Sequence, residues 1–154
     1  MSDNPTPRAA DPPAAAAPTS STQAGLEIAV TSSGTVVHVV LRNVGQTALK
    51  LFGPVSGPDR RHHDYLRAQL AAGAERRVLR FTGNRNASTT GLVELPAHGE
   101  ITDDLDLAIW ATQPINGGKP LAPGDHEVTL TYELSQPGVW NGRVTAGPVA
   151  IHVP

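Results

Sequence analysis

The densest set of side chains able to hold a metal ion is His62-His63-Asp64. Imidazole and carboxylate groups are common metal ligands. Adjacent side chains on a strand point to opposite faces, so His62 and His63 can share an ion only in a loop. Further ligands would have to come from distant histidines, namely His98, His126 or His152. Because adjacent histidines alone lack a ligand-spacing signature, the segment is interpreted as an exposed polar loop, and metal binding by it stays open.

A second cluster, Asp103-Asp104-Leu105-Asp106, offers carboxylate oxygens of the kind that calcium binds. It lacks the glycine and the distal glutamate of a calcium-binding loop. Alternation over Glu100–Leu107 places Asp104 and Asp106 on the polar face of a strand and Asp103 on the apolar, inward face. An inward charge discourages pairing between sheet edges. The cluster is therefore interpreted as a strand edge, and no metal or other cofactor is predicted.

The sequence carries no signature of catalysis. It has no Gly-x-Ser-x-Gly elbow, no phosphate-binding loop and no dinucleotide-binding fingerprint. It has no cysteine, which excludes disulfides, thiolate metal sites and cysteine nucleophiles. Serine, histidine and aspartate are present, but their presence does not make a catalytic triad. A non-enzymatic protein is predicted.

Charge is distributed unevenly in the middle of the chain. Residues 58–85 contain seven arginines and three acidic residues, whereas residues 94–106 contain five acidic residues and no lysine or arginine. The arginines are Arg60, Arg61, Arg67, Arg76, Arg77, Arg80 and Arg85. One interpretation is a basic patch for an acidic partner, with Arg60 and Arg61 as candidate binding residues. The preferred interpretation is that the two regions form neighbouring strands whose opposite charges pair across the sheet.

A long polar loop, Thr82–Thr90, separates two predicted strands. Hairpin connections usually take two to five residues, so the extra length favours a working surface. Asn84, Arg85 and Asn86 combine two adaptable amides with a planar charged donor. These three residues are candidate binding residues for a partner.

Alternating apolar and polar residues predict strands from Leu26 to the end of the chain. The clearest case is Val128–Leu134, where every second residue is apolar and Thr129 and Thr131 face the other way. Short strands bounded by glycine and proline turns are typical of a sandwich. The predicted fold is an all-β, antiparallel β-sandwich of about eight or nine strands.

Other segments give further predictions, and one of them fits two kinds of secondary structure. Val36–Leu41 is apolar on both faces and predicts a central strand covered on both sides. Tyr65–Leu70 fits either a strand or one helical turn, and Ala108–Thr112 predicts a short helical turn crossing between sheets. Trp110 and Trp140 are expected in the core or at a corner.

The N-terminal region differs in composition from the rest. Residues 1–24 are rich in proline, alanine, serine and threonine, with too few large apolar side chains to offset the entropy of ordering them. Nothing in their pattern predicts a strand. The expected organisation is a disordered tail over residues 1–24 and one sandwich domain over residues 25–154.

Composition limits the partners. The chain has 154 residues and a formal net charge of -2, whereas nucleic-acid and membrane-surface proteins usually carry a basic excess. No segment has the length of apolar residues needed to cross a bilayer. The N-terminus has neither the basic start nor the apolar stretch of a secretory signal. The chain as written is expected in the cytoplasm, with an exported form that has lost its signal as the alternative.

Three segments carry a family resemblance: Val39–Gly45, Leu92–Glu100 and Leu121–Val128. Their strand-and-turn order resembles bacterial immunoglobulin-like and fibronectin-type-III-like sandwiches over about Leu26–Pro154. It is also similar to the accessory β domain of deuterolysin-type metallopeptidases and to the intracellular proteinase inhibitor family. The His-Glu-x-x-His helix of the peptidase is absent, so only its accessory module could be present. The resemblance implies an immunoglobulin-like sandwich, and a fold does not by itself imply a function.

The expected function is binding, scaffolding or self-assembly through the loops, with a protein partner or a second copy of the chain. The first alternative is a peptidase inhibitor that inserts Thr82–Gly91 or Pro114–Pro120 into an active-site cleft. The second is a small metal-dependent enzyme or metal carrier that uses the histidines.

Overall fold

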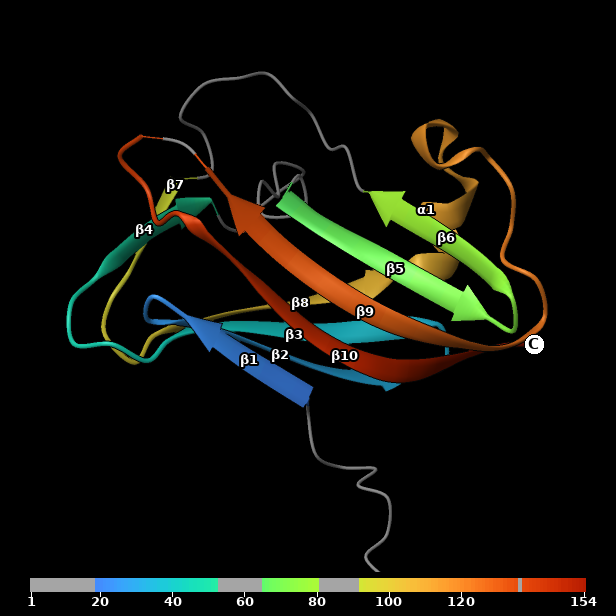
Figure 1. The fold of residues 1–154 in the computed structure, drawn as a ribbon, viewed down its shortest axis with the longest axis horizontal. Helices are drawn as coiled ribbons and strands as arrows, with labels where there is room; N and C mark the ends of the chain where they lie inside the picture. Colours follow the sequence, from blue (N-terminus) through green and yellow to red (C-terminus); the bar gives the residue numbers. More distant parts are fainter. Residues whose placement is uncertain (1–18, 53–64, 81–91, 136) are drawn as a thin grey trace, which may run out of the picture.

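A computed structural model describes residues 19–52, 65–80, 92–135 and 137–154. These residues form two four-stranded antiparallel sheets and one two-stranded sheet, with ten strands in all against the eight or nine expected (Figure 1). The two larger sheets pack face to face around one hydrophobic core, which confirms the predicted all-β sandwich. None of the helices in the described part of the chain has the length and apolar character needed to span a membrane.

The first sheet has the strand order β1-β2-β3-β8, with β1 at Thr19–Gln23, β2 at Leu26–Ser33, β3 at Val36–Asn43 and β8 at Glu100–Asp106. β3 is central, as expected, but its outer face is only partly covered in the described part of the chain. Val37 and Val39 are buried, whereas Val36 and Val40 are only half-buried. The expectation of a doubly covered strand is therefore wrong. β-branched residues also suit a pleated surface that is only partly buried.

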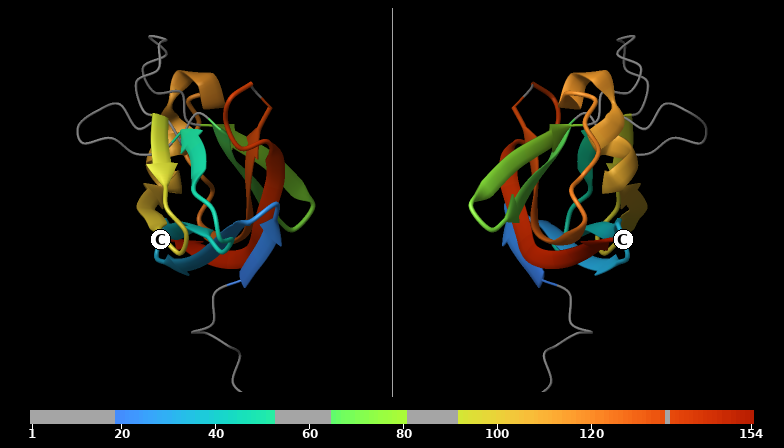
Figure 2. Two further views of the ribbon diagram at one scale, coloured as in Figure 1. Left: turned by 90° about the vertical axis from the view of Figure 1, so that its left-hand side faces the viewer. Right: turned by 90° about the vertical axis from the view of Figure 1, so that its right-hand side faces the viewer.

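The second sheet has the order β10-β9-β5-β6, with β5 at Leu66–Ala72, β6 at Glu75–Arg80, β9 at Gly124–Leu134 and β10 at Gly142–Val153. The ambiguous segment at Tyr65–Leu70 is mainly strand, because β5 pairs with both β6 and β9. β10 also contacts the first sheet: His152 donates its backbone N–H to the carbonyl of Gly34 at 3.0 Å. β10 therefore links the two layers along one side of the sandwich (Figure 2).

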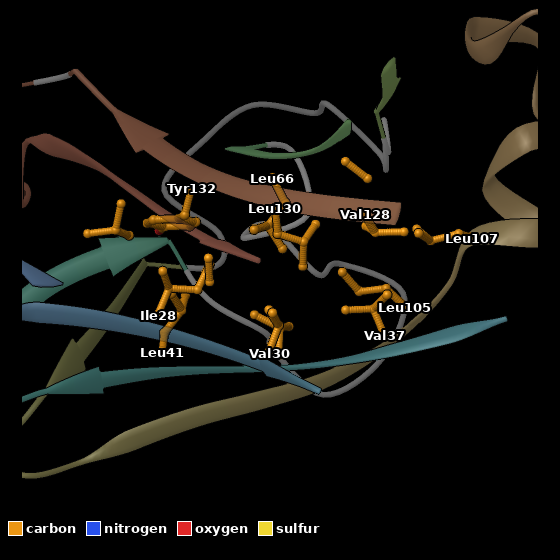
Figure 3. Packing of buried hydrophobic residues seen from close by; sticks show 14 of the residues in the cluster. Ile28, Val30, Val37, Leu41, Leu66, Leu105, Leu107, Val128, Leu130 and Tyr132 are labelled. Atoms are coloured by element: carbon orange, nitrogen blue, oxygen red, sulfur yellow. The ribbon is translucent and has the colours of Figure 1, made fainter. Parts of the chain in front are cut away.

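The centre of the core lies on β9. Leu130 and Tyr132 are fully buried between the sheets, and Ile28 and Leu41 approach from the opposite layer (Figure 3). Thr131 lies on the outer face, as predicted, yet only 5% of its surface is exposed. β9 has a neighbour on each side, and Thr131 lies opposite residues of both β5 and β10. The outer face of a central strand is partly covered by its cross-strand neighbours, which the alternation pattern does not register.

The folded region begins earlier than expected. β1 at Thr19–Gln23 lies within the segment assigned to the tail, and it pairs with β2 from Leu26 to Val30. The Gln23 side chain accepts the backbone N–H of Arg143 at 2.5 Å. A polar edge strand leaves no apolar signal in the sequence, because its pairing rests on backbone hydrogen bonds. Residues 1–18 lie outside the described residues.

Smaller elements complete the described part of the fold. β4 at Leu49–Phe52 pairs with β7 at Leu92–Leu95. The helix α1 at Leu107–Thr112 follows β8 and is followed by a 3-10 turn, η2, at Pro114–Asn116. The α1 helix confirms the predicted helical turn, and its N-terminus is capped by Asp106, which accepts the N–H of Ala108 at 3.1 Å. Trp110 and Trp140 are both buried, as expected.

Candidate functional site

The candidate binding residues predicted from the sequence lie outside the described residues. They are Arg60, Arg61, Asn84, Arg85 and Asn86, and the same is true of His62 and His63. Their roles stay predictions. The described residues nevertheless include four arginines of the basic region, Arg67, Arg76, Arg77 and Arg80, and the whole of β8.

The expected pairing between the basic and acidic regions is wrong for these residues. The four arginines lie on β5 and β6 in the second sheet, whereas β8 belongs to the first sheet and β7 pairs with β4. The acidic side chains of β8 pair with its neighbour β3: Glu100 lies 3.4 Å from Arg42, and Asp104 lies 2.5 Å from His38. The pairing preference failed because net charge in a segment does not encode which strands become neighbours.

The result is a basic surface at the edge of the second sheet. We call it the basic edge and define it as Arg76, Arg77, Val78 and Arg80 of β6 together with Lys119. Arg76, Val78 and Arg80 alternate with inward positions and are exposed, and half of the Val78 surface is accessible. Leu79 between them is fully buried, so β6 is fixed in the core by one face and displays two arginines and a valine on the other.

The side chain of Arg77 bonds to backbone groups of another segment, unlike those of its neighbours. Its Nη2 lies within hydrogen-bonding distance of three backbone carbonyls, those of Ala111 at 3.0 Å, Asn116 at 2.8 Å and Lys119 at 2.8 Å. These carbonyls come from α1, η2 and the segment that follows. The Arg77 guanidinium therefore fixes the α1–η2 segment against β6 and positions Lys119.

Asn116 closes one end of the free edge of β6. Its Oδ1 accepts the backbone N–H of Arg80 at 2.7 Å, and its Nδ2 donates to the carbonyl of Arg80 at 2.6 Å. The side-chain amide thus takes the place of a neighbouring strand at one residue. From the sequence, Pro114–Pro120 was considered only as an inhibitory loop. The role of Asn116 was not predicted, because an asparagine in a turn has no signature for pairing with a distant strand.

An open pocket of about 390 Å³ lies beside the basic edge, at the β5–β6 hairpin. Leu70 and Leu121 supply apolar lining, Arg76, Arg77 and Lys119 supply three positive charges, and Glu75 supplies one negative charge. His126 also lines the pocket; it is buried and donates its Nε2–H to the carbonyl of Ala122 at 2.8 Å. Apolar surface beside several cationic donors suits a ligand that carries both apolar and carboxylate groups.

The other histidines and carboxylates considered as possible metal ligands do not gather at one site in the described part of the chain. Within the described ranges, no group of three or more histidine, cysteine, aspartate or glutamate side chains is arranged to hold a metal ion. His152 pairs with Asp125 at 2.7 Å, and Asp104 of the acidic cluster pairs with His38. Asp103 faces inward, as predicted, and accepts the N–H of Asp104 at 2.8 Å.

Comparisons with protein-family models, with curated proteins and with solved structures gave no match for this chain.

Proposed function

We propose that this chain is a non-enzymatic, immunoglobulin-like binding module that holds an acidic segment of a protein partner at its basic edge. The observation that carries the proposal is the separation of the charged strands. Arg76 and Arg80 are exposed on a sheet that does not contain the acidic strand β8. Their charge therefore faces outward, where it can attract an acidic partner.

The strand order supports the immunoglobulin-like assignment. Immunoglobulin constant-type domains place strands A, B, E and D in one sheet and C, F and G in the other. With β2, β3 and β8 taken as A, B and E, the first sheet follows the order A-B-E. With β10, β9 and β5 taken as G, F and C, the second sheet follows G-F-C, and β6 extends it as an additional strand, C′.

The peptidase-inhibitor alternative has less support in the described residues. Pro114–Asn116 forms a 3-10 turn, and the Asn116 backbone and side chain are both bonded to β6. This segment is thus engaged in packing within the molecule. The other proposed inhibitory loop, Thr82–Gly91, lies outside the described residues. The basic edge is accordingly the better-supported site.

The test is an unbiased selection from a displayed library of random peptides on the purified full-length chain. We expect enrichment of sequences rich in aspartate and glutamate. Their binding should fall at least about tenfold when Arg76→Gln and Arg80→Gln are combined, since two charge-assisted contacts are lost. The matched control combines Arg42→Gln with Arg143→Gln, which removes the same charge from exposed residues outside the basic edge. Equal loss in both variants, or selected peptides without an acidic excess, would contradict the proposal.

A further inference from the structure

Among the strands of the described residues, β6 has a neighbour on one side only. It is the last strand of the second sheet in the order β10-β9-β5-β6. β5 and β6 form a hairpin that is closed by the pair Ala72 and Glu75 across a two-residue turn. Further along β6, Arg77 lies opposite Leu70 and Leu79 lies opposite Ala68. In an antiparallel pair, hydrogen-bonded residues alternate with residues whose backbone groups point away from the partner strand. The backbone groups of the intervening residues of β6 therefore face outward.

The contact with Asn116 independently fixes this direction. Both the N–H and the carbonyl of Arg80 bond to the Asn116 side chain, on the side away from β5. Strand geometry repeats every two residues, so the N–H and carbonyl of Val78 point the same way. Within the described residues, these two groups of Val78 have no hydrogen-bond partner. Next along the strand, Arg76 presents its backbone to the same side.

The side chains of β6 select what can pair there. Arg76 and Arg80 flank Val78 on the exposed outer face. A second copy of β6 pairing antiparallel about Val78 would place Arg76 opposite Arg80, and like charges directly opposite each other destabilise a pair. An extended segment with acidic residues two positions either side of an apolar residue would instead meet each arginine with a carboxylate.

We propose that β6 accepts such an acidic segment as an additional antiparallel strand, with its central apolar residue opposite Val78. The inference rests on the proposed function and specifies how the partner is held. Backbone hydrogen bonds to Val78 and Arg76 provide affinity, as in other cases of strand addition to a sheet edge. The arginines provide selectivity for acidic side chains. Asn116 already holds the backbone groups of Arg80, so the backbone pairing of the added strand ends before that position and the acidic residue on that side meets Arg80 through its side chain alone.

The test uses a synthetic peptide, acetyl-Ser-Glu-Thr-Val-Thr-Glu-Ser-amide, and its binding to the full chain by calorimetry. In the proposed register the N–H of the central valine points at β6, and those of the two threonines point away. N-methylation of the valine should weaken binding by about tenfold or more, because it removes a hydrogen bond and blocks close approach of the backbones. N-methylation of the threonine that follows is the matched control and should change binding by less than about threefold.

A variant of the protein provides a second arm. Val78→Pro removes an N–H that does not bond to β5, and edge strands accept proline where the N–H faces solvent. Its thermal unfolding should remain cooperative, and it should bind the unmodified peptide about tenfold more weakly than the parent chain. If the variant does not fold, the N-methylated peptides decide the question alone.

The outcomes separate this inference from the proposed function. If the unmodified peptide binds through Arg76 and Arg80 but both N-methylated peptides bind equally well, the acidic partner is held by side chains alone and strand addition is refuted. If the unmodified peptide binds no better than a version with lysine in place of glutamate, the proposed acidic specificity itself fails. If only N-methylation of the valine weakens binding, the result supports the addition of a strand at β6.

Discussion

Replacing Arg77 with methionine should measure how firmly the α1–η2 segment is held against β6. Methionine retains most of the apolar stem and removes the guanidinium, whose Nη2 lies 2.8 to 3.0 Å from three carbonyls. A hydrogen bond from a charged donor contributes about 1.5 to 3 kcal/mol. Arg77 is half-buried, so water replaces part of what is lost. We expect the free energy of unfolding to fall by about 2 kcal/mol. For a domain of this size, that corresponds to a fall in Tm of about 4 to 8 °C.

Two further variants make this prediction decisive. Arg76→Met removes an exposed guanidinium whose hydrogen bonds within the described residues are to the nearby carbonyls of Gly73 and Glu75. It should lower the free energy of unfolding by less than about 0.5 kcal/mol. Arg77→Lys keeps the charge but lacks the planar fork, so it should recover less than half of the loss. Differential scanning calorimetry gives the three Tm values. Equal shifts for Arg76→Met and Arg77→Met would refute the reasoning.

Three other predictions concern the fold, each measured by urea unfolding. Leu130→Ala should lower the free energy of unfolding by about 2 to 5 kcal/mol, as truncations of core side chains do. Thr131→Ala should lower it by about 1 kcal/mol, because Thr131 is buried and its Oγ1 lies 3.2 Å from that of Thr145. Removal of residues 1–18 should leave the free energy of unfolding nearly unchanged. Removal of residues 1–24 also deletes β1 and should lower it by at least about 2 kcal/mol. Equal effects of the two deletions would mean that β1 does not stabilise the fold. Gly147→Ala should cost more than about 2 kcal/mol, because its Cβ would lie 2.6 Å from the carbonyl oxygen of Val128; an unchanged midpoint would contradict this contact.

Local patterning was sufficient to predict the class of fold and several of its elements. The alternation in Val128–Leu134 correctly identified the inward face of β9, and the α1 turn and the inward position of Asp103 were also predicted correctly. These features are determined within a few residues along the chain. Side-chain direction repeats every two residues in a strand, so an apolar pattern identifies the face that must be buried.

The candidate site depended on information that no local pattern contains. Strand order placed the arginines of β6 and the acidic residues of β8 in different sheets, which overturned the predicted charge pairing. β1 was missed because backbone pairing holds a polar edge strand without an apolar signal, and the role of Asn116 depends on its contact with Arg80 far away in sequence. The sequence by itself determined which faces of the strands are buried, through local periodicity. Only the tertiary structure decided which strands are neighbours and which edge stays open, because those depend on contacts between residues distant in the chain.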